Sequence, residues 1–147
     1  MYTTLKTYAR RYLVEQQNDY PYTAKDGTCF HQESKGVVKG ADAFRVTKSS
    51  VAALKAAIAQ QPIAVSIEAD TIVFQSYTSG ILNSARCGTN LDHGVLAVGY
   101  GTENGQDFYI VKNSWGTSWG LSGYVKIAAV EGSGICGIQL DSSYPSI

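Results

Sequence analysis

The amino-acid sequence predicts an α+β fold, with helices in the first part of the chain and a mostly antiparallel β unit in the second. Apolar residues near the start recur at helical spacing, whereas short β-type runs separated by Gly, Asn and Ser follow Ile63. The 147 residues, 44% of them hydrophobic, suffice for an ordinary packed domain. Neither a repeat nor a low-complexity tract interrupts this order.

The helical part is expected to end near residue 44. An amphipathic helix is predicted over residues 3–17, because one face carries the apolar side chains of Leu5, Tyr8, Ala9, Tyr12 and Leu13. Residues 20–40 are rich in turn formers and hold Cys29, which is typical of a boundary between two packing units. We therefore divide the chain into residues 1–44 and 45–147.

One helix and five strands are expected after residue 44. Ser49 or Ser50 can cap a helix over residues 51–58, and Pro62 ends it. The β-type runs that follow lie at residues 63–69, 91–101, 107–113, 121–128 and 135–141.

The charge balance argues against several classes of partner. Twelve basic residues match twelve acidic ones, so no net field favours nucleic acid or an anionic membrane surface. No apolar run has the length of a membrane span, and the first residues contain no signal-peptide core. Three cysteines and two histidines fit no metal-binding spacing, and the Gly99-x-Gly101 pattern is a weak match to a cofactor loop. A peptide or small-molecule partner is the better expectation.

The segment from Leu91 to Asn113 predicts a β-hairpin. If its turn is centred on Glu103, His93 lies directly opposite Asn113, with Cβ atoms about 4.5 to 5.5 Å apart, and the amide oxygen can accept an imidazole N–H. A slip of one residue would turn one side chain to the other face. Trp115 would share their face and shield the pair from water.

These residues also have purely structural interpretations. A lone histidine at a strand entrance is often a surface or hydrogen-bonded residue, and Asn113 before Ser-Trp-Gly can simply form a turn. The aromatic residues of the β unit are then part of its core.

Five ordered motifs resemble those of papain-family, cathepsin L-like cysteine proteases. They are Tyr20–Tyr22 with Asp26–Cys29, Leu91–Gly101, Val111–Gly116 with Trp119 and Gly120, Gly123–Ile127, and Gly134–Gly137 with Tyr144 and Pro145. The resemblance covers essentially the whole chain. It implies a papain-like fold, with residues 1–44 as the end of the helical left domain and the crossover, and residues 45–147 as the antiparallel, barrel-like right domain.

The resemblance also implies a role for each site residue. His93 is the general base and imidazolium partner of a cysteine, Asn113 orients its ring, and Trp115 covers their contact. Cys87 and Cys136 match a family disulfide, whereas Cys29 matches a cysteine whose partner lies outside this chain. No metal or cofactor is implied.

The nucleophilic cysteine is expected outside this chain. In the family it precedes the histidine by about 130 to 150 residues. Cys29 lies far closer to His93 and sits in Asp-Gly-Thr-Cys-Phe, without a Cys-Gly-Ser-Cys-Trp context, so we reject it as the nucleophile. The glutamine of the oxyanion hole and the glycine-rich substrate strip are also absent, which indicates a fragment that is inactive by itself.

A substrate pocket is implied at Ser66, Leu91, Asp92 and Asp141, which match positions contacting the side chain two residues before the cleaved bond. An acid at Asp141 could admit a basic side chain, although a solvated carboxylate is the structural alternative. Leu121 stands where many relatives carry an acidic residue, and its effect has no explanation from the sequence.

Three functional hypotheses follow. The first is an endopeptidase of lysosomal or secreted type that acts on peptides or proteins, completed by its N-terminal segment and controlled by a propeptide or a cystatin-like inhibitor. The second is a non-catalytic protein that keeps the protease fold for structure or binding. The third, a plain β-rich binding module, does not explain the ordered motifs.

Overall fold

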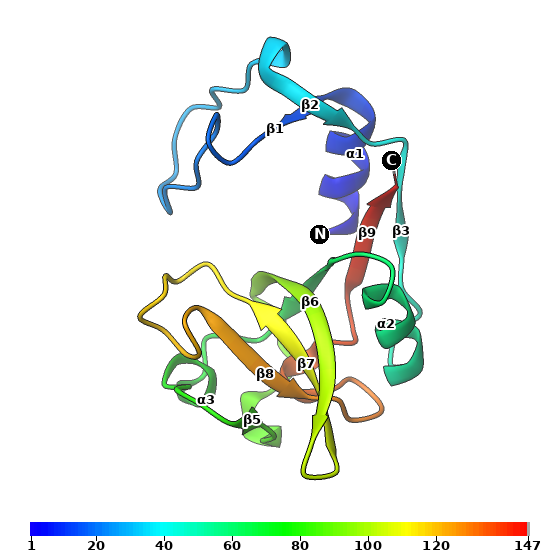
Figure 1. The fold of residues 1–147 in the computed structure, drawn as a ribbon, viewed down its shortest axis with the longest axis vertical. Helices are drawn as coiled ribbons and strands as arrows, with labels where there is room; N and C mark the ends of the chain where they lie inside the picture. Colours follow the sequence, from blue (N-terminus) through cyan, green and yellow to red (C-terminus); the bar gives the residue numbers. More distant parts are fainter. Residues whose placement is uncertain (147) are drawn as a thin grey trace. The chain divides into compact units, whose positions relative to one another are not determined.

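The computed structural model describes residues 1–146, which form two compact units (Figure 1). The larger unit comprises Met1 and residues 45–144, and the smaller unit comprises residues 2–44 with Pro145 and Ser146. The helices of residues 1–146 lack the combination of length and apolar character that crossing a membrane requires.

The smaller unit combines one helix with a two-stranded sheet. Its elements are α1 (Tyr2–Arg11), β1 (Leu13–Glu15), the 3-10 helix η1 (Glu33–Lys35), β2 (Gly36–Lys39) and β3 (Asp42–Arg45), the last of which ends in the larger unit. The predicted helix over residues 3–17 is thus too long. Residues 13–15 leave it because they pair with β2, with Val14 opposite Val38. A Cβ at Gly36 would overlap the Leu13 side chain, so this close approach requires glycine.

The larger unit contains the sheet that positions the site. Its elements are α2 (Val51–Ile58), β4 (Ile63–Ile67), α3 (Ile72–Gln75), β5 (Ile81–Leu82), η2 (Ala85–Cys87), β6 (His93–Glu103), β7 (Gln106–Lys112), β8 (Tyr124–Ala128), η3 (Ile135–Gly137) and β9 (Ser142–Ser146), which crosses into the smaller unit. The sheet order is β3-β9-β4-β6-β7-β8-β5. Only the β5–β8 pair is parallel among the strand pairs given for the described residues, so the mostly antiparallel sheet is confirmed.

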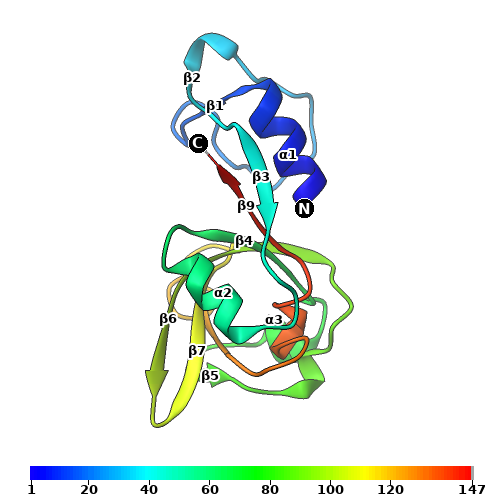
Figure 2. The ribbon, with the colours of Figure 1, turned by 90° about the vertical axis from the view of Figure 1, so that its right-hand side faces the viewer.

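Alternation along β4 builds the core of the larger unit. Ile63, Val65 and Ile67 are fully buried, and helix α2 adds Leu54 and Ile58 from beside the sheet (Figure 2). The predicted bounds of α2 are confirmed, and its cap is Ser50, whose Oγ accepts a 3.1 Å hydrogen bond from the Ala53 N–H.

One expected strand near the end of the chain is absent from the described residues, and one unexpected helix is present in the middle. The predicted strand over residues 135–141 is instead η3 and a turn, because Gly134, Cys136 and Gly137 adopt positive φ angles that no strand accommodates. The final strand is β9. Helix α3 is not expected from the sequence, since its four residues are too short to show helical periodicity.

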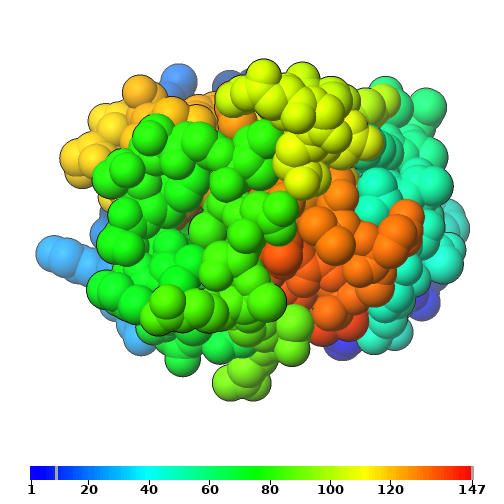
Figure 3. All heavy atoms as spheres, turned by 90° about the horizontal axis from the view of Figure 1, so that it is seen from below, coloured from blue at the N-terminus to red at the C-terminus, as the bar shows by residue number. Residues whose placement is uncertain are grey.

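The β6–β7 hairpin projects from the sheet as a two-stranded ribbon. Figure 3 shows its tip beside the segment that follows β8, where the Ala129 N–H donates to the Asp107 carbonyl at 2.9 Å. Lys55 of α2 pairs with the Asp107 carboxylate at 2.5 Å, and Lys126 of β8 pairs with Glu103. Both hairpin strands are therefore tied to neighbouring elements.

Candidate active site

His93 is the first residue of β6, and its neighbours fix where that strand begins. It pairs with Ile67 at the end of β4. The preceding residue, Asp92, donates its N–H to the Ile67 carbonyl at 3.0 Å, and its carboxylate accepts the N–H groups of Ala69 and Asp70 at 2.8 and 3.1 Å. The strand entrance therefore has little freedom to shift.

Asn113 follows directly after β7 and points its amide oxygen at the imidazole. Its own N–H donates to the Gly123 carbonyl at 2.9 Å, which continues the β7–β8 ladder by one residue. The Oδ1 atom lies 2.8 Å from His93 Nε2 and 2.8 Å from the Ser114 backbone nitrogen. A backbone N–H can only donate, so the atom it meets must be the oxygen and not the amide nitrogen.

This orientation determines the tautomer of a neutral His93. The amide oxygen can only accept, so Nε2 carries the proton and donates it to Asn113. The lone pair of the ring then lies on Nδ1, for which the described residues provide no hydrogen bond. Nδ1 is therefore the atom that can take up a proton from a reactant.

The hairpin register differs from the predicted one. Lys112 pairs with Leu96 and Gln106 with Glu103, so the turn is centred on Asn104 and Gly105, and a bulge interrupts the ladder between Ala97 and Gly99. His93 and Asn113 are therefore not directly opposed. They still meet, because continuing the Leu96–Lys112 register places Asn113 beside Val95, two residues from His93 and on the same face of β6.

Trp115 reaches His93 from the segment after β7 and not from a continued strand. Its ring is stacked on His93, with centroids 5.2 Å apart and an interplanar angle of 29°. Phe74 and Trp119 each meet Trp115 edge-on at 5.4 Å. Phe74 and Tyr77, which contact Trp119 at 5.0 and 5.7 Å, are ring neighbours that the sequence analysis missed, since their only signal is apolar spacing around the unexpected helix α3.

The residues of the implied pocket lie at three places around β4. The Ser66 hydroxyl donates to Asp141 Oδ2 at 3.0 Å, and the Ser66 N–H donates to the Asp141 carbonyl at 2.9 Å. Leu91 packs against Gly137 so closely that a Cβ there would lie 2.8 Å from Leu91 Cδ2. The Asp92 carboxylate is occupied by the two backbone N–H groups described above, so it orders the loop after β4.

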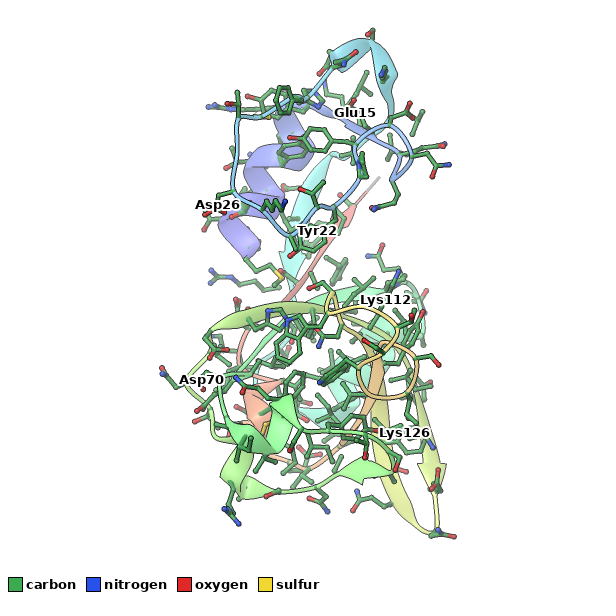
Figure 4. The ribbon with its side chains drawn as sticks, turned by 90° about the vertical axis from the view of Figure 1, so that its left-hand side faces the viewer. Glu15, Tyr22, Asp26, Asp70, Lys112 and Lys126 are labelled. Carbon is green, nitrogen blue, oxygen red and sulfur yellow. A yellow bond between two sulfur atoms is a disulfide. The ribbon has the colours of Figure 1, made fainter. Side chains whose placement is uncertain are left out.

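Acidic side chains gather near the entrance of β6. Asp70, labelled in Figure 4, follows the end of β4, and its pKa is raised by burial of the carboxyl and by the nearby charge of Asp92. Lys112, the last residue of β7, is labelled in the same view of the larger unit. Among the described residues, no three His, Cys, Asp or Glu side chains are arranged to hold a metal ion.

The cysteines divide as the resemblance implies. Cys87 and Cys136 form a disulfide with Cα atoms 4.8 Å apart, which confirms that pair. Cys29 is an exposed free thiol in the smaller unit.

Comparison with known proteins identifies the family. The profile of the papain family cysteine proteases matches residues 1–146. The chain is 50% identical to cysteine proteinase RD21A of Arabidopsis thaliana, in an alignment that covers 90% of this chain and 29% of that protein. It is 42% identical to the KDEL-tailed cysteine endopeptidase CEP2 of Arabidopsis thaliana, in an alignment that covers 90% of this chain and 37% of that protein. It thus spans well under half of either relative.

The fold agrees with this assignment. The structure matches the bromelain protease of Ananas comosus with a TM-score of 0.82 at 37% identity, over 99% of this chain and 67% of bromelain. The mixed helix and sheet architecture is accordingly papain-like. The chain belongs to the papain family of cysteine proteases.

Proposed function

We propose that this chain carries the histidine and asparagine of a papain-type endopeptidase site, and that the nucleophilic cysteine lies in a segment outside these residues. The observation that supports it most is the 2.8 Å contact between His93 Nε2 and Asn113 Oδ1, which leaves the lone pair on Nδ1 available. A histidine with one nitrogen held by an acceptor and the other unengaged has the geometry of a general base and not of a core residue.

The chemistry follows from that geometry. A cysteine beside Nδ1 would give up its proton to the ring, because an adjacent imidazolium lowers the pKa of a thiol. The thiolate attacks the peptide carbonyl and forms a thioester as the C–N bond breaks, and the Nδ1 proton passes to the leaving amine. His93 then removes a proton from water, which hydrolyses the thioester and restores the thiol.

Two features around Asn113 support a site that continues beyond this chain. The Asn113 side chain is only 8% exposed, yet its Nδ2 has no hydrogen-bond partner among the described residues. An open groove of about 350 Å³ borders it, lined in part by Gly94, Leu96 and Lys112. An additional segment seated there would supply the missing acceptor.

The substrate class is a peptide or protein. We infer that Asp141, held against Ser66, favours a basic side chain two residues before the cleaved bond, because its carboxylate already pairs with a cation, the Met1 ammonium, at 3.6 Å. We further infer regulation by a propeptide or a cystatin-like inhibitor, and membership of the papain family supports this inference.

An oxidising compartment of the secretory route, lysosomal, vacuolar or extracellular, is the proposed location. The Cys87–Cys136 disulfide supports this location, since such bonds persist mainly outside the cytosol. The relative that carries a KDEL tail supports the same route.

The test uses the complete coding sequence expressed as a whole protease. His93→Ala removes both the proton acceptor and the proton donor, so the rate should fall by at least about 10² to 10⁴. Asn113→Ala removes only the orienting acceptor and should cost less, with part of the loss being stability. Arg86→Ala, an exposed site on η2, serves as the control and should match the wild type.

The alternative is a non-catalytic protease-like protein with a structural or binding role. It predicts that a thiol-directed covalent inhibitor labels no cysteine in the complete protein and that His93→Ala changes no measurable activity. The isolated 147-residue chain should hydrolyse no peptide. If that chain does hydrolyse peptides and His93→Ala abolishes the activity, the proposed position of the cysteine is wrong.

A further inference from the structure

Four rings in the larger unit form a continuous row that ends on the site histidine. Tyr77 lies 5.7 Å from Trp119, Trp119 lies 5.4 Å from Trp115, and Trp115 lies 5.2 Å from His93, all measured between centroids. Trp115 itself is 39% exposed, so burial alone does not fix the position of its ring. Its position over the imidazole depends on the rings behind it.

The Trp119 ring is held by one hydrogen bond at its indole N–H and by two neighbouring aromatic rings. Its indole N–H donates to the Gln75 carbonyl at 3.0 Å, which fixes one point of the ring. A single hydrogen bond leaves the indole free to pivot about that point. The neighbouring rings of Phe74, at 5.0 Å, and Tyr77 limit this rotation.

Tyr77 is the anchored end of the row. The residue is 7% exposed, and its hydroxyl donates to the Gly80 carbonyl at 2.6 Å and accepts the Lys126 N–H at 3.3 Å. One bond closes the turn after α3, and the other ties the hydroxyl to strand β8. Burial raises the pKa of this hydroxyl, so it remains an uncharged donor over the working range of the protein.

The loop that carries the tryptophans is shaped to lie on the Tyr77 ring. Gly120 has a φ of +55°, and a Cβ at this position would lie 2.6 Å from the Tyr124 carbonyl oxygen and 3.1 Å from Tyr77 Cδ1. Only glycine permits this approach without displacing the tyrosine. The contact between the loop and Tyr77 is therefore specific and not incidental packing.

We propose that Tyr77 is a positioning residue for His93, acting through Trp119 and Trp115. Its hydrogen-bonded ring limits the pivot of Trp119, and Trp119 in turn keeps Trp115 stacked on the imidazole and over the His93–Asn113 hydrogen bond. The inference rests on the proposed function only in naming His93 as the base, and its test requires no catalytic activity.

The test measures how fast diethyl pyrocarbonate modifies each of the two histidines of the 147-residue chain, followed by peptide mass mapping. Tyr77→Leu should speed the modification of His93 by roughly two- to tenfold, the range expected for loss of one aromatic contact. His31, in the smaller unit, is the internal reference and should react at the wild-type rate. Tyr77→Phe keeps the ring contact and loses only the two hydrogen bonds, so its rate should lie between those of the wild type and Tyr77→Leu.

A matched control separates positioning from general loosening of the core. Leu82→Ala removes a side chain that is 8% exposed on β5, on the same core but outside the row of rings, and it should leave the rate at His93 unchanged. If Tyr77→Leu does not fold, Tyr77→Met replaces it with the same expectation. The proposal is wrong if the reagent modifies His93 at the wild-type rate in a folded Tyr77→Leu or Tyr77→Met variant. It is also wrong if Leu82→Ala speeds the modification of His93 as much as the Tyr77 variant does. Either result leaves the activity test of His93 untouched.

Discussion

Asn113 determines more of the site than its single hydrogen bond to the imidazole suggests. Because the Ser114 N–H can only donate, the amide cannot be reversed without losing that bond, so the same oxygen faces His93 Nε2. Asn113 thereby fixes the tautomer of a neutral imidazole, which decides the nitrogen that faces a reactant. Trp115 and Asp92 act on the same histidine from its face and from its backbone.

Asp141 is the residue at which substrate preference can be tested. In the complete protease, Asp141→Asn keeps the shape of the side chain but removes its charge. The ratio of kcat/KM for paired peptides with Arg or Leu two residues before the cleaved bond should fall by on the order of tenfold, since a hydrogen bond to a charged group is worth about 1.5 to 3 kcal/mol. Asp70→Asn, which removes an exposed acid of the larger unit, is the control. An unchanged Arg-to-Leu ratio would show that Asp141 is a solvated surface acid.

Among the elements, three segments of the smaller unit converge on His31. Its Nδ1 lies 3.0 Å from Glu15 Oε2 of β1, its Nε2 lies 3.0 Å from Glu33 Oε2 of η1, and the rings of Tyr8 and Tyr12 lie 6.0 and 5.2 Å away. Glu15 is labelled in Figure 4, and its side chain is only 3% exposed. The protonated imidazole can donate to both carboxylates at once.

This contact gives the smaller unit a pH dependence. Hydrogen bonds to Glu33 and Glu15 raise the pKa of His31 above its ordinary 6.5, so its contribution to stability is complete below 6.5 and is lost as pH rises through the raised value. The hydrogen bond from His31 lowers the pKa of Glu33 below its ordinary 4.5, so that contribution is present above 4.5 and is lost as pH falls through the lowered value. The contact is therefore strongest between pH 4.5 and 6.5.

Amide hydrogen exchange tests this window. Peptides covering residues 12–16 and 30–36 should lose protection, after correction for intrinsic rates, between about pH 5.5 and about pH 7.5. A peptide covering β7 in the larger unit provides the reference. His31→Gln, which cannot be charged, should show low protection and no such step. A wild-type chain with equal protection at both pH values would exclude the His31 contact as its cause.

Most helices and strands of the larger unit near the site could be predicted from the sequence, but their exact pairing could not. It predicts α2 with its cap, and it predicts strands β4, β6, β7 and β8, because period-two burial and Gly-rich turns are local signals. It predicts that His93 and Asn113 are neighbours, but it places the turn wrongly, since the bulge near Val98 has no local signature. The ring row that begins at Tyr77 depends on tertiary packing between α3 and a distant loop, and no sequence period reports it.

For the whole molecule, the disulfide is the main covalent restraint. Cys87 and Cys136, 49 positions apart in the sequence, join η2, which follows β5, to η3, which follows β8. Replacing both by alanine should lower the free energy of unfolding by about 2 to 5 kcal/mol. Urea unfolding followed by circular dichroism measures this loss. Cys29→Ser, which removes the free thiol, is the control, and a double variant as stable as that control would contradict the prediction.

The row of rings also determines what the intrinsic tryptophan fluorescence of the chain reports. The sequence contains two tryptophans, of which Trp115 stacks on His93 and Trp119 contacts Trp115, whereas residues 2–44 contain five tyrosines and no tryptophan. Fluorescence excited selectively from indole therefore originates from the row of rings that ends on His93, and a change in it reports on that part of the larger unit. Unfolding confined to the smaller unit is silent in that signal and is visible only through the tyrosines. The chain thus carries a separate intrinsic probe for its larger unit.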